Sequence, residues 1–135
     1  MTEWTMDAIV DNIPGLTARI DEQLEALDCP MKAQMQIDVA IDEMFSNVAN
    51  YAYKNGVGSV TVRFEFDAES REVRVSFIDG GVPYNPLEKD DPDVTLPTEA
   101  RGIGGLGIFL VKKTMDALRY KYANGQNIVT IVKRI

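Results

Sequence analysis

The sequence contains no histidine, one cysteine and no long apolar run. Cys29 alone cannot form an internal disulfide, and a helix that crosses a bilayer needs about 20 consecutive apolar residues. The 14 Lys and Arg residues are outnumbered by 21 Asp and Glu residues, which gives a net charge of -7 without any Lys/Arg-rich run. Nucleic acids and anionic membranes carry the same sign of charge, so non-specific binding to either is disfavoured.

The first residues, MTEWTMDAIVDN, have neither the basic region nor the apolar region of a secretory signal. Together with the single cysteine, this predicts a cytoplasmic protein. A length of 135 residues is typical of one domain with its own core. We therefore expect residues 1–135 to form a single domain.

Hydrophobic periodicity predicts the order strand, helix, helix, hairpin, loop, helix, hairpin. This order is typical of an α+β fold, a two-layer sandwich whose amphipathic helices cover one face of a largely antiparallel, mixed sheet. The expected elements are a strand over 3–8, helices over 12–27 and 30–53, a hairpin over 59–79, a long loop over 80–106, a helix over 107–118 and a hairpin over 119–135.

The helix expected over 30–53 carries polar residues beside its apolar stripe. Glu43 and Asn47 are four residues apart, so they project from one face about a turn apart, and Asn50 falls on the same row. A carboxamide oxygen suits a Mg²⁺ ion that already holds phosphate oxygens, and a nearby carboxylate can orient or deprotonate a hydroxyl or water. A solvated polar edge of the helix is the alternative interpretation.

Two further motifs follow along the chain. In DGGVPYNP, residues 79–86, Asp79 ends a strand and could accept a hydrogen bond from the exocyclic amine of adenine, while Gly81 permits close approach of the base. A plain Asp-Gly turn is the alternative. GIGGLG, residues 102–107, leads directly into a helix whose first N–H groups could hold phosphate oxygens, or it is a glycine-rich hinge without a ligand.

In this order, the three motifs resemble the N, G1 and G2 boxes of the GHKL ATP-binding superfamily. Within it, the chain looks most like the small stand-alone anti-sigma factor serine kinases of bacteria, and the resemblance covers nearly the whole chain. It implies the Bergerat α/β sandwich, with ATP under a lid formed by 84–106. Part of the family has a histidine after the N box where this chain has Tyr51, a difference that leaves the metal and base positions intact.

By motif position, the resemblance implies a role for each candidate site residue. Asn47 would coordinate Mg²⁺, and Glu43 would be the general base for phosphoryl transfer. Asp79 would hold the adenine amino group with Gly81 beside the base, and Thr130 would contribute to water or hydroxyl contacts there. The other candidates for nucleotide contacts are Asn50, Pro83, Gly104, Gly105, Leu106 and Gly107, and those for a phosphate contact are Arg101 and Lys112.

The resemblance implies an ATP-dependent protein serine kinase that phosphorylates a STAS-type anti-anti-sigma protein and sequesters a sigma factor, with ATP and Mg²⁺ as cofactors. A different interpretation is a non-catalytic module whose lid senses ATP or ADP and thereby gates protein binding. A detached histidine-kinase catalytic domain is disfavoured because the chain has no histidine and no helical dimerisation hairpin, although it could act on a histidine in trans. A homodimer is also implied, and Trp4 and Met6 mark either its surface or part of the core.

Overall fold

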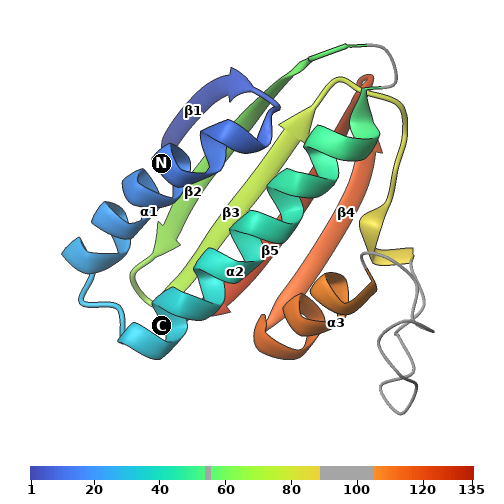
Figure 1. Ribbon diagram of the computed structural model, residues 1–135. Coiled ribbons are helices and arrows are strands. Elements are labelled where there is room, and N and C mark those ends of the chain that lie inside the picture. The colour runs from blue at the N-terminus through green and yellow to red at the C-terminus, as the bar shows by residue number, and fades with distance from the viewer. Residues whose placement is uncertain (54–55, 89–104) are drawn as a thin grey trace.

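The computed structural model describes residues 1–53, 56–88 and 105–135, and at residues 105 and 106 only the backbone. Figure 1 shows the strands and α-helices of this part of the chain. The strands are β1 (Thr2–Asp7), β2 (Ser59–Asp67), β3 (Glu72–Asp79), β4 (Ala117–Ala123) and β5 (Gln126–Arg134). The helices are α1 (Ile13–Ala26), α2 (Met31–Asn47) and α3 (Gly105–Thr114), and shorter helical turns lie at Val10–Asn12, Val48–Ala52 and Pro86–Glu88.

The strands form one sheet in the order β1-β2-β3-β5-β4. Val62 of β2 lies opposite Phe77 of β3, which lies opposite Val129 of β5. Because side chains alternate between the faces of a sheet, these residues share one face, and all three are buried. Trp4 of β1 lies opposite Val62, and it packs against the same core together with Met6.

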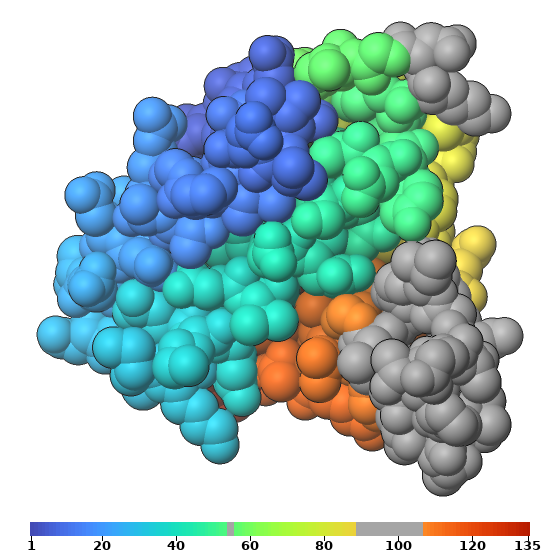
Figure 2. All heavy atoms as spheres, in the orientation of Figure 1, coloured from blue at the N-terminus to red at the C-terminus, as the bar shows by residue number. Residues whose placement is uncertain are grey.

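The three α-helices cover this apolar face, with α2 running between α1 and α3 (Figures 1 and 2). Full burial of one large apolar side chain contributes about 1.5–3 kcal/mol, so the helix–sheet layer is the main source of stability. No helix in the described ranges is long and apolar enough to cross a membrane. The buried helix residues recur at helical spacing: Leu16, Ile20 and Leu24 in α1, and Ile37, Ile41, Met44 and Phe45 in α2.

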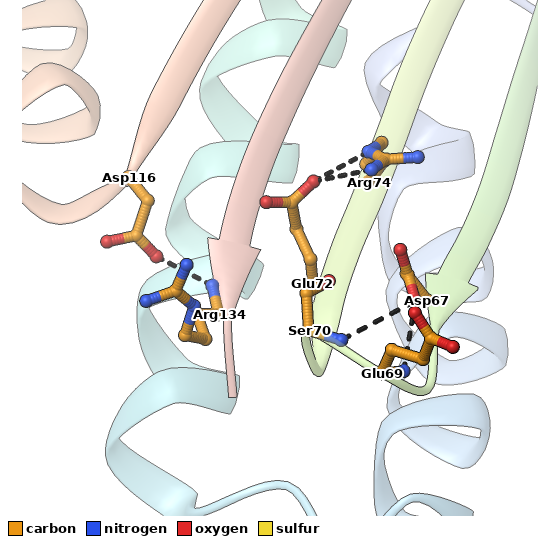
Figure 3. Close-up of polar contacts among 7 residues, drawn as sticks. All are labelled: Asp67, Glu69, Ser70, Glu72, Arg74, Asp116 and Arg134. Carbon is orange, nitrogen blue, oxygen red and sulfur yellow. Dashed lines mark hydrogen bonds and ion pairs between the residues drawn. The ribbon is translucent and has the colours of Figure 1, made fainter.

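Polar contacts fix the end of the sheet where β2 turns into β3 (Figure 3). Asp67 Oδ1 accepts hydrogen bonds from the backbone N–H groups of Glu69 at 3.0 Å and Ser70 at 3.5 Å. Asp116 Oδ2 accepts one from the backbone N–H of Arg134 at 2.6 Å. The bonds to Asp67 favour one geometry of the turn between β2 and β3 and thereby one hairpin register, whereas the bond to Asp116 joins the residue before β4 to the end of β5.

The two-layer α+β sandwich is confirmed, with three differences of detail. Every strand pairing in the described ranges is antiparallel, so the sheet is not mixed there. The helix expected over 107–118 ends at Thr114, and β4 begins at Ala117. The helix expected over 30–53 is α-helical only to Asn47 and then widens into a π-helical turn.

A pair of carboxyl groups joins α1 to α2. Asp21 of α1 and Asp38 of α2 each have a buried Oδ1 atom to which no described residue donates a hydrogen bond. Burial, the hydrogen bond to Asp21 and the charges of Asp21 and Glu25 together raise the pKa of Asp38 from 3.8 to about 7, and burial contributes most. Two neighbouring carboxylates disfavour double ionisation, so Asp38 keeps a proton almost to neutral pH.

We expect Asp38 to make stability fall as the pH rises from about 4 to about 7. Its ordinary pKa is 3.8 and its folded value is about 7, so the folded state binds more protons between these values. The Asp38→Asn variant should lack this loss, with a Tm at pH 8 several degrees above that of the wild type.

Thermal unfolding at pH 5 and pH 8 measures the effect, with Asp42→Asn, which changes an exposed carboxylate of α2, as the control. Equal pH dependence of the Tm in both variants would show that the carboxyl pair has no such role.

Candidate functional site

The C-terminal ends of α2 and β3 meet at one edge of the sandwich (Figure 1). The N–H of Val82 donates to the carbonyl oxygen of Ala52 at 2.8 Å. A Cβ on Gly81 would lie 2.1 Å from that same oxygen, so only a residue without a side chain allows the approach. Gly81 thus joins the segment after β3 to the end of the helix, and Figure 2 shows the two segments in contact.

The helix widens where it reaches this edge. Val48–Ala52 is a π-helical turn, in which hydrogen bonds span five residues instead of four. The row of side chains that includes Asn47 is therefore not continued by Asn50. Asn47 is buried and lines a cavity, whereas Asn50 is exposed to solvent. The structure does not bring Asn50 into the site.

Asn127 of β5, only 2% exposed, links four parts of the site. Its Oδ1 accepts hydrogen bonds from the Tyr84 N–H at 3.0 Å and the Tyr120 hydroxyl at 2.5 Å. Its Nδ2 donates to Asp79 Oδ1 at 3.0 Å and to the carbonyl of Val82 at 2.8 Å. The oxygen and both hydrogens of the Asn127 amide therefore have partners, and burial raises the pKa of its partner Tyr120.

Asp79 is a carboxylate held in a buried position, with 4% exposure. Its Oδ1 also accepts the N–H of Gly81 at 2.9 Å. Within residues 1–53, 56–88 and 105–135, both donors to Asp79 bind Oδ1, and Oδ2 can accept from a ligand. The amine of an adenine base is a donor of the required kind.

A small cavity lies among these residues. Apolar walls with a few convergent polar groups are typical of small-molecule sites. The cavity volume is about 10 Å³, which is room for about one water molecule. It is lined by Met44, Asn47, Val48, Ala52, Asp79, Tyr84, Pro86, Asn127 and Val129.

Glu43 lies one turn before Asn47, against the start of α3. A Cβ on Gly107 would lie 2.2 Å from Glu43 Oε2, so the glycine lets the helix start meet the carboxylate. Asn47 Nδ2 donates to the Glu43 carbonyl at 2.7 Å and lies 3.3 Å from Glu43 Oε1. The amide nitrogen is thereby turned to Glu43, and Oδ1 lies 3.5 Å from the Tyr84 hydroxyl at the cavity.

Thr130 is on the other face of the sheet. Its hydroxyl is hydrogen-bonded to that of Ser76 at 2.8 Å, whereas Asn127 lies opposite Asp79 on the helix-covered face. Thr130, expected to contribute to water or hydroxyl contacts near the base, is therefore not brought to Asp79, whereas Asn127 lies beside it. The sequence NIVTIV is apolar at both odd and even positions, so alternation alone does not show which face Thr130 occupies. Only the pairing of β5 with β3, which sets Asn127 opposite Asp79, shows which face each residue occupies.

The remaining predicted residues are spread more widely. Gly105 and Leu106 open α3 next to Gly107, and Lys112 lies in the last turn of the same helix. Pro83 is exposed and lines an open groove next to the cavity, together with Ala52, Tyr53, residues 80–82 and Tyr122. Gly104, Arg101 and most of the lid expected over 84–106 lie outside the described residues.

A family model, the histidine kinase-like ATPase domain, matches residues 7–133. The chain belongs to this family. The predicted membership of the GHKL superfamily is thereby confirmed. In this ATPase domain, the end of α2 and the end of β3 meet at one cavity.

Two curated relatives of this ATPase domain are both named serine-protein kinase RsbW. The protein of Bacillus mycoides is 30% identical over 95 residues, which are 67% of this chain and 58% of that protein. The protein of Listeria monocytogenes is 28% identical over 123 residues, which are 87% of this chain and 73% of that protein. The chain thus spans little more than half of the Bacillus protein.

Two solved structures share the fold. The crystal structure of the RsbU and RsbW domains of Rv1364c from Mycobacterium tuberculosis has a TM-score of 0.66 at 19% identity, covering 99% of this chain and 32% of that one. The histidine kinase domain of a blue-light activated histidine kinase from Erythrobacter litoralis has a TM-score of 0.60 at 16% identity, covering 90% of this chain and 60% of that one. Both confirm the sandwich of helices on a sheet.

The residues present fit a nucleotide that carries its own metal ion. Asp79 Oδ2 is available for an amine, and Asn47 Oδ1 is a neutral oxygen of the kind that ligates Mg²⁺. Within the described ranges, no group of three or more Asp, Glu, Cys or His residues could hold a metal ion without further ligands. Mg²⁺ would therefore need phosphate oxygens beside Asn47.

We expect Gly81→Ala to destabilise the fold and Gly80→Ala to leave it nearly unchanged. The new Cβ at position 81 would lie 2.1 Å from a backbone oxygen, whereas at position 80 the nearest atom is the Tyr53 hydroxyl at 4.0 Å. Relief of the first clash requires a backbone shift at a cost of about 1–3 kcal/mol. Urea unfolding of both variants measures the difference in the free energy of unfolding. Equal values would contradict the contact between Gly81 and Ala52.

Proposed function

We propose that this domain binds Mg-ATP in the cavity between α2 and β3 and transfers the γ-phosphoryl group to a serine of a STAS-type anti-anti-sigma protein. The observation that supports it best is that Asp79 and Asn47, from distant parts of the sequence, line one cavity. The names of the RsbW relatives support serine as the acceptor.

In the proposed reaction, each residue has a separate task. Asp79 accepts a hydrogen bond from the adenine amine, and Asn47 Oδ1 ligates the metal ion. Mg²⁺ neutralises charge on the phosphates when it is bound. Glu43 takes the proton of the serine hydroxyl as the serine oxygen bonds to the γ-phosphorus, the bond to the β-phosphate oxygen breaks, and ADP leaves. The start of α3 beside Glu43 offers backbone N–H groups to the phosphates.

A second candidate function is a nucleotide-gated binding module without phosphoryl transfer. It is favoured by the surroundings of Glu43, whose carboxylate lies against Gly107 and within 3.3 Å of the Asn47 amide. With these neighbours, Glu43 could serve to position α3 rather than to take a proton. ATP or ADP in the cavity would then alter the affinity for a protein partner through α3.

The wider setting follows from the family resemblance. The proposed kinase also binds a sigma factor, acts in the cytoplasm and forms a homodimer. Direct binding to nucleic acid or membranes is not expected for a chain with a net charge of -7. Trp4 and Met6 pack against the core but are only partly buried, so the N-terminal strand remains the proposed dimer surface.

We expect micromolar binding of Mg-ATP, about -8 kcal/mol, and weaker binding to Asp79→Asn. The asparagine can keep its Oδ1 for the donors from Gly81 and Asn127, but it turns an NH₂ group toward the adenine amine. The loss should be larger for ATP than for GTP, whose base has a carbonyl in place of this amine. Calorimetry with both nucleotides measures this, and absence of heat with ATP in the wild type would contradict nucleotide binding.

Glu43→Gln and Asn47→Ala should have different effects. If Glu43 is the base, its glutamine variant should bind Mg-ATP within a few-fold of the wild type, while phosphoryl transfer falls by roughly 10²–10⁴. Asn47→Ala removes a metal ligand, so binding and transfer should fall together.

Nucleotide titration and single-turnover transfer to a STAS protein separate these effects. If wild type and Glu43→Gln transfer equally slowly while ATP still changes partner affinity, the gated binding module replaces the kinase.

A further inference from the structure

The ring of Tyr84 lies at the site, where it contacts Tyr51 and Asn47. It stacks on Tyr51 with ring centroids 5.1 Å apart and an interplanar angle of 27°. Its hydroxyl donates to Asn47 Oδ1 at 3.5 Å, the outer limit for a hydrogen bond, and it lines the same cavity as Asp79. Tyr84 therefore contacts Asn47 Oδ1, the oxygen proposed to ligate Mg²⁺, and borders Asp79, the carboxylate proposed to bind adenine.

The cavity cannot take a purine base with Tyr84 in this position. Its volume of about 10 Å³ suits one water molecule, and a purine is many times larger. Met44, Val48 and Val129 form its apolar wall and belong to the buried core, where close packing makes movement costly. Tyr84 is only half-buried and follows a strand end. A half-buried side chain loses less packing when it moves than a residue of the buried core does.

The backbone around Tyr84 is anchored by its own hydrogen bonds. The N–H of Tyr84 donates to Asn127 Oδ1 at 3.0 Å. Just beyond it, Asn85 Oδ1 accepts the N–H of Leu87 at 2.9 Å, and Pro86 is buried. Rotation of the Tyr84 side chain about its Cα–Cβ bond would thus open the cavity without loss of these backbone bonds.

We propose that the side chain of Tyr84 occupies the nucleotide cavity in the free protein and that a bound adenine nucleotide displaces it, which makes Tyr84 a determinant of nucleotide affinity. The inference rests on the proposed function. Each binding event then has to break the stack on Tyr51 and the contact with Asn47. The apparent affinity is lowered by the fraction of molecules in which the cavity is open.

Calorimetric titration of Mg-ATP into Tyr84→Ala and Tyr84→Phe tests the inference. Tyr84→Ala should bind with a Kd about two- to tenfold lower than that of the wild type, the range expected when one aromatic pair no longer opposes binding. Tyr84→Phe is the matched control, because it keeps the ring and removes the hydroxyl that lies 3.5 Å from Asn47 Oδ1. Its Kd should stay within about twofold of the wild-type value.

A measurement on the wild type makes the test independent of how well the variants fold. Nuclear Overhauser effects between the ring protons of Tyr51 and Tyr84 should be present in the free protein and disappear with saturating Mg-ATP. Their persistence in the complex would overturn the inference.

The outcomes distinguish this inference from the proposed function. If the wild type binds ATP and Tyr84→Ala binds it equally or more weakly, Tyr84 does not compete with the nucleotide, and the inference fails alone. If neither protein binds ATP, the proposed function fails and the inference fails with it.

Discussion

The site depends on one buried amide. Asn127 donates to Asp79 and to the Val82 carbonyl, and accepts from the Tyr84 N–H and the Tyr120 hydroxyl. These four bonds tie together the ends of β3 and β5, the segment after β3, and β4. A buried amide that lost one partner would leave an unsatisfied polar group at a cost of about 1–3 kcal/mol. The network therefore favours one position for the Asp79 carboxylate.

The second constraint is the backbone contact between Gly81 and Ala52, which brings the helix to this network. Glu43 and Asn47 are separated from Asp79 by more than thirty positions in the sequence, and the hairpin of β2 and β3 lies between them. Without a side chain at Gly81, the segment after β3 can pack directly on the helix end. Two contacts therefore form the cavity. One is the hydrogen-bond network of the Asn127 amide, and the other is the close approach of Gly81 to Ala52.

Structural features that follow from a local repeat can be predicted from the sequence. Alternation in β2 and β3 and helical spacing in α1 and α2 predict the layers, because burial on one face imposes those periods. The spacing of Glu43 and Asn47 within one α-helix likewise predicts that they share a face, and the structure places them 3.3 Å apart between Oε1 and Nδ2. The prediction that Asp79 ends a strand is also confirmed.

Features that depend on long-range register were not accessible in this way. Thr130 and Asn127 differ in which face of β5 they occupy, and only pairing with β3 decides this. Asn50 would fall on the same row as Asn47 only in an unbroken α-helix, and the helix is π-helical over Val48–Ala52. The boundary between α3 and β4 was misplaced because Leu118 packs against the core from a strand although its spacing also suits a helix.

The π-helical turn at Val48–Ala52 has a consequence for comparison among homologous chains. Such a turn accommodates one more residue than an α-helical turn of the same kind. A deletion of one residue there would therefore allow the helix to close as an α-helix while the later residues keep the face that they occupy now. Ala52 would stay against Gly81. In a sequence alignment, a one-residue gap at this place would therefore mark the loss of the π-helical turn and not the loss of the contact between the helix and the segment after β3.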